Sequence, residues 1–361
     1  MTLTDLLKSG LGDESVAQRA AGIEFRQRLE PPFGQLTMPP VYEAPLEIHP
    51  RSIDGTVHDV IELDSVGSSA NRLEERLLDE HRAERYGLPL ATTTIAAGEH
   101  EFVITTLEAP HRLMDAWIRL SELPGSDQAF EDSDQGREIS LASPGALDPI
   151  LETSAHDLLF GTWDSHRTGP SGQVRVARSL TTTVLGLRPR EVRTIAARRD
   201  PLNLGEAKDV KAPKGLKLSE QGLSSIPPQR RRPGVSIDEA LFVGFLSFAS
   251  LRRLRFQRYD NVEARVLLAL LALHAITLRV GEGWSLRSEC DLIPTADLQI
   301  LVRTAGSSGA ESLPAAPEEV AGAFADARQS TAINDRSVHL VGGSRLTPLV
   351  QRALEKESTS G

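Results

Sequence analysis

The spacing of apolar residues predicts two long helices in the second half of the chain. They cover about residues 236 to 257 and 261 to 281, where Leu, Val, Ile and Ala recur at helical intervals. Ser236 and Glu239 stand three residues apart, as in a capping box at the start of the first helix. The apolar run 266–278 is 13 residues long and contains His274, which makes it too short to span a bilayer. We expect a buried helix and no membrane partner.

The first half of the chain alternates extended segments with helices. Residues 57 to 63 are β-branched enough to predict a strand, and residues 68 to 86 carry apolar positions at helical spacing. Residues 90 to 97 and 101 to 107 predict a hairpin around Gly98, and Pro110 opens a further helix. Residues 13 to 30 predict a helix, and the prolines that follow it predict an irregular connector.

The remaining segments are shorter. Residues 157 to 163 and 298 to 303 predict strands, and residues 173 to 187 and 191 to 197 alternate as extended chain. Short helices are expected near 317 to 329 and 347 to 356. The pattern therefore interleaves strands and helices along the whole chain.

The charge of this acidic chain reverses between residues 167 and 258. That window holds 15 Arg and 4 Lys against 7 acids, a local net charge of +12, which leaves −22 for the rest of a chain whose net charge is −10. Clustered cations supply the phosphate contacts and counterion release that dominate affinity for nucleic acids. The alternative is a set of unrelated solvated faces that only lie near each other in sequence.

Composition narrows the kind of site. Aromatic residues make up only 4% of the chain, which favours tracking of a nucleic-acid backbone over stacking of successive bases. The single cysteine, Cys290, excludes a disulfide within the chain and a cysteine metal cluster, and a cytoplasmic location follows. The histidines are scattered without metal-ligand spacing. We expect no metal and no cofactor.

The segment 64–74 (DSVGSSANRLE) is the most unusual local sequence. A Ser/Gly loop between a strand and a helix offers hydroxyls, backbone N–H groups and the positive helix end to a phosphate. Asn71 and Arg72 add further donors. The alternative is an ordinary turn capped by Ser68 or Ser69.

Two other groups of cations are candidates for phosphate contact. Arg175 and Arg178 project from a predicted extended segment. Arg230, Arg231 and Arg232 lie together in an exposed loop, since three adjacent arginines cannot all be buried.

Candidate catalytic groups are weaker. His111 and Asp115 are one helical turn apart and could pair, but that spacing favours a surface pair over a catalytic one. Asp164, Ser165 and His166 are consecutive, and neighbouring side chains on extended chain point to opposite faces, so they cannot form a triad among themselves. The motifs favour binding over catalysis.

Several of these segments together resemble a known family. The chain is similar to the RAMP-superfamily backbone protein of the type I-U (also called I-G) CRISPR effector complex, the Cas-seven-group subunit. The matching segments are 64–74 (DSVGSSANRLE), 109–112 (APHR) with Asp115 and Ala116, 159–165 (LFGTWDS), 217–223 (KLSEQGL) with 226–228 (IPP), and 251–256 (LRRLRF). They occur in order between about residues 60 and 260.

The resemblance implies an α+β fold: a modified RRM (ferredoxin-like) palm, an antiparallel sheet with helices, carrying a β-hairpin thumb and helical insertions. We expect residues 1–50 to form an N-terminal helical arm with a Pro-rich connector. Residues 51–305 would form the palm with its inserted thumb, and residues 306–361 a C-terminal helical extension that completes the palm.

The resemblance also implies partners: CRISPR RNA, target DNA through the guide, other copies of the chain arranged head to tail, and other Cascade subunits. Such a subunit holds the guide backbone without reading its sequence, and it is not an enzyme. Combined with the charge pattern, it predicts the following RNA-binding residues: Ser65, Ser68, Ser69, Asn71, Arg72, Arg175, Arg178, Arg230, Arg231 and Arg232.

Two other functions compete with this interpretation. Relatives within the same superfamily cut RNA, so the chain could be an endoribonuclease that processes precursor CRISPR RNA with His111 or His166 as general acid or base. It could also be a generic single-strand-binding protein, which would bind unrelated RNA without assembling into a particle of defined stoichiometry.

Overall fold

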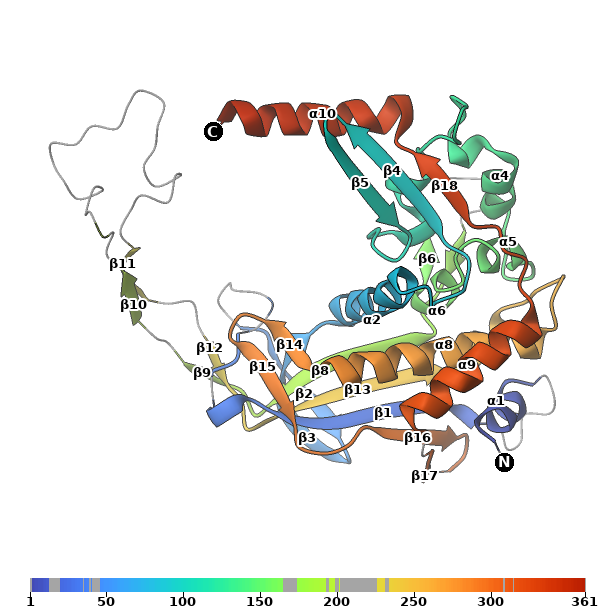
Figure 1. Cartoon of the computed structure of the whole chain (residues 1–361). Helices are drawn as coiled ribbons and strands as arrows, with labels where there is room; N and C mark the ends of the chain where they lie inside the picture. Colours follow the sequence, from blue (N-terminus) through green and yellow to red (C-terminus); the bar gives the residue numbers. More distant parts are fainter. Residues whose placement is uncertain are drawn as a thin grey trace, which may run out of the picture.

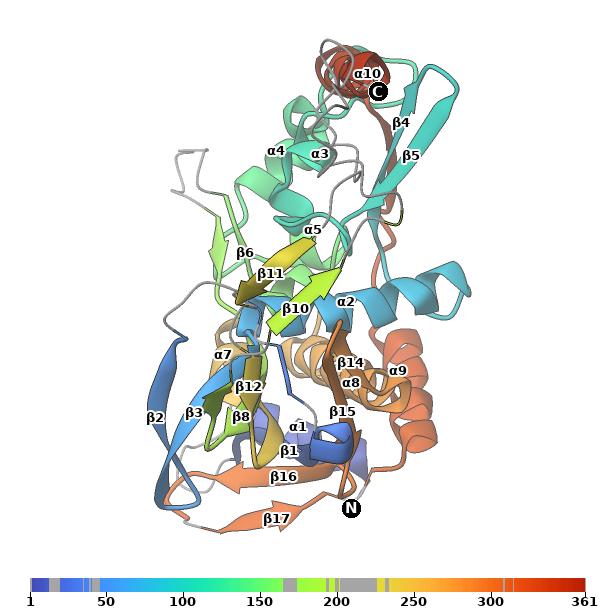
Figure 2. The same cartoon turned by 90° about the vertical axis from the view of Figure 1, so that its left-hand side faces the viewer.

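The computed structural model describes residues 2–12, 20–34, 36–38, 40, 46–164, 174–192, 195–198, 201, 226–230, 234–307, 309–313 and 315–360. They form the predicted α+β fold, in which a large antiparallel sheet lies beneath a layer of helices (Figure 1). A smaller sheet and several short helices lie on the far side of that helix layer (Figure 2).

Four strands of the large sheet and two helices form the centre of the fold. The strands lie in the order β16, β1, β13, β8, and each neighbouring pair is antiparallel. One helix connects β1 to β8 and the other connects β13 to β16, which is the β-α-β-β-α-β order of a ferredoxin-like fold. The elements are β1 Ala20–Glu30, α2 Val66–Arg82, β8 Leu180–Leu187, β13 Glu239–Ser247, α8 Asn261–Glu282 and β16 Gln299–Thr304. The predicted palm is confirmed.

Strand β1 replaces part of a predicted helix. Ile23, Phe25 and Leu29 are buried in the main core, while Arg26 and Arg28 alternate with them on the other face of the sheet. This period of two is that of a strand. The helix predicted over 13 to 30 is therefore wrong at residues 20–30, and the first palm strand precedes the expected palm boundary at residue 51.

Strand β13 replaces most of the helix predicted over 236 to 257. It lies between β1 and β8, and only α7, Phe248–Arg253, is helical in that stretch. Ala240, Leu241 and Phe242 are all buried, so the strand shows no alternation that could separate it from a buried helix. Glu239 caps no helix, because it is the first residue of this strand. Its carboxylate pairs with Arg28 of β1 at 2.5 Å.

Helix α8 confirms the other long helix. Asp260 caps it by accepting hydrogen bonds from the N–H groups of Val262 (2.8 Å) and Glu263 (3.0 Å). By length and composition α8 could cross a membrane, but 78% of its apolar window is buried within the fold. Two further helices pack on it: α1 Leu3–Leu11 and α9 Pro317–Thr331. It is therefore the core helix of the palm.

Short strands extend the palm sheet at both ends. A hairpin, which includes the strand predicted over 57 to 63, continues the sheet beyond β8, and three more strands attach near β1 and β16. These strands are β2 Ile48–Ile53, β3 Thr56–Asp64, β14 Trp284–Arg287, β15 Cys290–Pro294 and β17 Ala310–Ser312.

The chain between α2 and β8 forms an insertion above the helix layer (Figure 2). The predicted hairpin around Gly98 is confirmed, and a strand from the C-terminal part of the chain pairs with it in parallel. The elements are β4 Ala91–Ala97, β5 His100–Thr105, η3 Arg112–Met114, α3 Ala116–Arg119, η4 Phe130–Asp132, α4 Asp134–Ser140, α5 Asp148–Leu151, α6 Asp157–Phe160, β6 Thr162–Trp163, β7 Arg175–Val176, β18 Val338–Val341 and α10 Gly343–Ser360. The strand predicted over 157 to 163 is wrong at α6 and correct only at β6.

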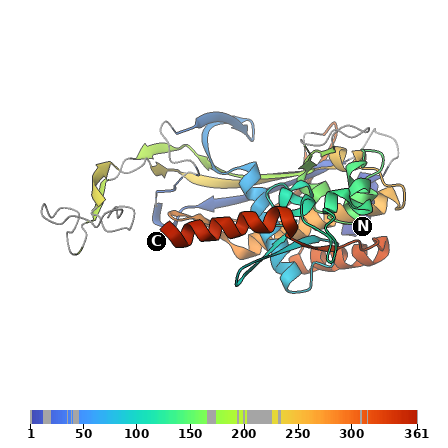
Figure 3. The same ribbon diagram turned by 90° about the horizontal axis from the view of Figure 1, so that it is seen from above.

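Between β8 and β13 the chain leaves the palm as a two-stranded extension (Figures 1 and 3). It is built from two antiparallel pairs, β9 Arg190–Val192 with β12 Gly234–Ser236 and β10 Ile195–Arg198 with β11 Ile226–Arg230. This is the β-hairpin thumb expected of the fold.

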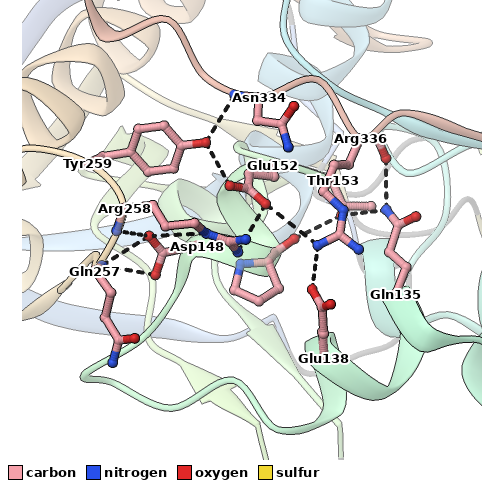
Figure 4. Close-up of polar contacts among 11 residues, drawn as sticks. Gln135, Glu138, Asp148, Glu152, Thr153, Gln257, Arg258, Tyr259, Asn334 and Arg336 are labelled. Atoms are coloured by element: carbon pink, nitrogen blue, oxygen red, sulfur yellow. Dashed lines mark hydrogen bonds and ion pairs between the residues drawn. The ribbon is translucent and has the colours of Figure 1, made fainter.

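A buried polar joint connects the insertion to the palm and to the C-terminal segment (Figure 4). Glu152 of the insertion is fully buried and accepts a hydrogen bond from the Tyr259 hydroxyl at 2.6 Å. Its carboxylate also pairs with Arg258 at 3.1 Å, and its backbone carbonyl accepts from the Arg336 N–H at 3.0 Å. Asp148 accepts a hydrogen bond from the N–H of Arg258 at 2.7 Å. Three distant parts of the chain therefore depend on two carboxylates.

Replacing Tyr259→Phe should lower the free energy of unfolding by about 1.5–3 kcal/mol, because a buried carboxylate loses a hydroxyl donor. Urea denaturation followed by circular dichroism measures this. Gln257→Ala, at a neighbouring exposed side chain, should stay within about 0.5 kcal/mol of the parent. Equal stability of the Phe variant and the parent would show that the joint carries no net energy.

Candidate nucleic-acid interface

Helix α2 begins at Val66 because Ser65 caps it. The Ser65 hydroxyl oxygen accepts a hydrogen bond from the Ser68 N–H at 3.2 Å. The first turn contains no acidic side chain, so the positive end of the helix has no carboxylate of its own beside it. The strand-to-helix transition is present at Ser65, but the predicted loop is wrong, because residues 66–72 lie within α2. The cap is Ser65 instead of Ser68 or Ser69.

The other predicted residues of this segment differ in accessibility. Asn71 is exposed and Ser68 is half-buried, so both can meet a ligand. Ser69 is buried, and its hydroxyl lies 2.6 Å from that of Thr182 on β8. This use inside the fold argues against a guide contact by Ser69.

Arg72 connects α2 to the strands beneath it. Its guanidinium lies 3.3 Å from the buried carboxylate of Asp64 and donates to the backbone carbonyl of Leu286 on β14. The side chain keeps 24% of its surface exposed. Arg72 therefore holds the start of α2 in place, and part of its charge is balanced by Asp64.

Three of the segments that carry the family resemblance converge beyond this helix start. Glu74 of α2 is buried and accepts two hydrogen bonds from Arg112, one of them from Nη2 at 2.8 Å. Arg112 Nη1 donates to the Gly161 carbonyl at 3.1 Å, and its guanidinium lies 5.7 Å from the Phe160 ring. The pair therefore joins a palm helix to two segments of the insertion.

A second buried carboxylate lies beside this pair. Asp157 is fully buried and accepts hydrogen bonds from the Ser154 hydroxyl at 2.6 Å and the Leu113 N–H at 3.2 Å. Burial raises its pKa to about 6. Burial likewise raises the pKa of Glu74 to about 7, against the opposing effect of Arg112, and lowers the pKa of His156 to about 3. The imidazole is therefore neutral at physiological pH.

Arg178 lies next to this cluster, just before β8. It is half-buried, and among the described residues it forms no hydrogen bond or ion pair. Gly161 has φ +85°, and a Cβ built there would lie 2.9 Å from Arg178 Cγ, so the side chain passes directly over a position that needs glycine. Burial and the nearby charge of Arg112 lower the Arg178 pKa.

Arg175 is exposed on β7. Its guanidinium stacks over the ring of Trp163, which is opposite it on β6, with 5.4 Å to the ring centroid. Arg175 also borders a small hollow of about 170 Å³ together with Arg253. Arg175 and Arg178 thus remain the best-placed cations of the predicted set.

Of the third predicted group, the structure describes Arg230 alone. Arg230 is the last residue of β11, and its backbone pairs with Ile195 of β10. Arg231 and Arg232 lie outside the described residues. Their contacts with RNA therefore stay predictions.

Part of the positive charge of the basic window is used inside the protein. Arg188 pairs with Asp238 at 2.6 Å and Arg190 pairs with the same carboxylate at 3.3 Å. Arg258 belongs to the polar joint described above. The cations that can meet an outside phosphate are thus fewer than the sequence count indicates.

The candidate catalytic residues do not form a site in the described part of the chain. The Asp115 carboxylate accepts the backbone N–H of His111 at 3.0 Å and caps α3, so the predicted pairing of side chains is wrong. His166 lies outside the described residues. Within the described ranges, no group of three or more potential ligands could hold a metal ion.

The sequence interpretation did not select Glu74, Arg112 or Asp157 as site residues. Arg112 has φ +53° and is buried, which is unusual for an arginine. Glu74 sits among Leu73, Leu77 and Leu78 on the apolar face of α2. A carboxylate at an inward helical position was the signal that could have revealed the pair.

Comparison with known proteins finds a similar family. Residues 23–190 match the model of the family described as CRISPR-associated protein GSU0053. The matched stretch is a little under half of the chain. The match confirms the resemblance found in the sequence, and the matched region of this CRISPR-associated family contains Glu74, Arg112, Asp157 and Arg178.

Two solved structures are also similar to this chain. One is the crystal structure of Thermofilum pendens Csc2, with 10% identity, a TM-score of 0.30, and coverage of 96% of this chain and 80% of that chain. The other, titled as a CRISPR RNA-guided surveillance complex before nicking, has 11% identity, a TM-score of 0.36, and coverage of 92% and 99%. No curated protein matches the chain in sequence.

The contribution of Asp157 to stability should fall as pH rises from about 4 to about 6. The folded-state pKa of Asp157 is about 6 against an ordinary value of 3.8, so the folded protein binds more protons than the unfolded chain in that window. The effect is about 3 kcal/mol for this shift, and it is present below the window and lost above it. Urea titrations at several pH values measure the difference in unfolding free energy between the parent and Asp157→Asn, which should change by this amount across the window. A difference that stays constant with pH would show that Asp157 makes no such contribution.

Proposed function

We propose that this chain is the backbone subunit of a type I CRISPR surveillance (Cascade) complex of the type I-U kind. It binds the CRISPR RNA and presents the guide bases for pairing with target DNA in antiviral defence. The observation that carries the proposal is the family match over residues 23–190, which contains α2 and the Arg178 segment. The ferredoxin-like palm with an outward thumb supports the same role.

The chemistry of the interface fits a protein that must accept any guide sequence. Arg175 and Arg178, with Asn71, Ser68 and the cap of α2, offer charges, an amide, a hydroxyl and N–H groups. These groups recognise phosphate and 2′-OH, which are the same at every nucleotide. Binding through them is independent of base sequence.

The proposal includes partners and a location. Copies of the chain would associate head to tail along one guide, beside other Cascade subunits, in the cytoplasm. Such a heterologous contact repeats as long as guide RNA is available. Catalysis is not part of this role, and the pure protein should leave precursor CRISPR RNA uncut.

Co-expression with a CRISPR array and the neighbouring effector genes tests the assembly. We expect a ribonucleoprotein that contains several copies of this chain per guide. Isolation of the chain only as a monomer that cleaves precursor RNA would instead support an endoribonuclease.

Arg178→Ala should weaken RNA binding similarly for guides of unrelated sequence. Loss of one phosphate contact should reduce the log–log slope of affinity against salt by about 0.7 to 1. Fluorescence anisotropy with labelled single-stranded RNAs at several salt concentrations measures this. Arg352→Ala, an exposed arginine on α10, is the matched control and should change neither affinity nor slope. Equal slopes for the Arg178 variant and the parent would remove Arg178 from the interface.

A further inference from the structure

Glu74 has two cations beside it but bonds to only one of them. Arg112 occupies both carboxylate oxygens, through Nε to Oε1 and through Nη2 to Oε2. The charge of Arg178 also acts on the Glu74 carboxylate, yet no ion pair joins these two side chains. The carboxylate is thus committed to Arg112.

Arg112 is held where it cannot exchange places with Arg178. Its third donor, Nη1, is bound to the Gly161 carbonyl, and its guanidinium lies over the Phe160 ring. The next residue, Leu113, is fixed through its N–H to the buried Asp157. With 7% of its surface exposed, Arg112 has no route to solvent without local unfolding.

Arg178, unlike Arg112, has no bonded partner in the described part of the chain. It is half-buried, so it has lost part of its hydration, and it has no carboxylate contact in the described part of the chain. A cation in this condition gains from an anion that reaches it from outside. The nearby positive charge of Arg112 strengthens that gain.

We propose that Arg112 is a positioning residue that occupies Glu74 and thereby keeps Arg178 available for a phosphate group of the guide RNA. This inference rests on the proposed function. Without Arg112, the Glu74 carboxylate would turn to Arg178, and the interface would lose a charge although Arg178 itself is unchanged.

Three variants of the full chain test this: Arg178→Ala, Arg112→Met, and the double variant Glu74→Met with Arg112→Met. The first two should each reduce the salt slope of RNA binding by about 0.7 to 1, because one phosphate contact is lost in both. The double variant removes the competing carboxylate together with its partner, so it should restore the slope of the parent. A purely structural role for Arg112 predicts no such rescue.

The probes are two labelled single-stranded RNAs of equal length and unrelated sequence. Arg119→Met is the matched control, since Arg119 pairs with Glu131 at 2.7 Å elsewhere in the insertion. Its slope should equal that of the parent. Thermal unfolding of every variant shows whether the fold is retained. Replacing a buried ion pair by two apolar side chains is often neutral for stability, so the double variant is the one best able to fold.

The outcomes separate this inference from the function on which it rests. Failure of the parent to bind either RNA would refute the proposed function. A parent that binds, with a weakened Arg178 variant and a double variant that is equally weakened, would refute only the role of Arg112. If Arg112→Met does not fold, Arg112→Gln takes its place as the single variant, and a slope equal to that of the parent in Arg112→Gln would refute the role of Arg112.

Discussion

The buried pair of Glu74 and Arg112 is the interaction on which the arrangement of this protein depends. It joins α2 of the palm to the insertion at the place where the Gly161 turn and Arg178 meet. Removing one partner from a buried pair leaves an uncompensated charge, at a cost of about 3–5 kcal/mol. The relative position of palm and insertion is therefore set by charge as well as by apolar packing.

The same principle explains why the palm can present cations on a chain that is acidic overall. Many arginines form ion pairs with carboxylates of the same chain, as Arg188, Arg258 and Arg72 do. Arg178 is different. Its charge acts on the Glu74 carboxylate, but that carboxylate is already bonded to Arg112. Which arginine can meet a phosphate is thus decided by which carboxylates are already occupied.

Two groups of buried polar contacts fix the insertion at different places. The pair of Glu74 and Arg112 fixes it to α2 of the palm. Asp148 and Glu152 fix it to the beginning of α8 and to the segment before β18 (Figure 4). Because the carboxylates of both groups are buried, the insertion and the palm form one support for the residues between them. Arg178 lies beside this support, in the short connection between β7 and β8.

The sequence by itself determined the long helix α8, the β3-to-α2 transition, the hairpin around Gly98 and the resemblance to a family that matches residues 23–190. These depend on local spacing and on short segments in order. It misplaced β13, since burial on both faces of a sheet interior hides the alternation of a strand, and it overlooked in β1 an alternation of apolar and charged residues that has the period of a strand. Only the tertiary structure decided that Ser69 is internal, that Asp115 caps α3, and that Arg112 and Glu74 form a pair. The reason is physical: a side chain's partner is fixed by long-range packing, which residue spacing alone does not encode.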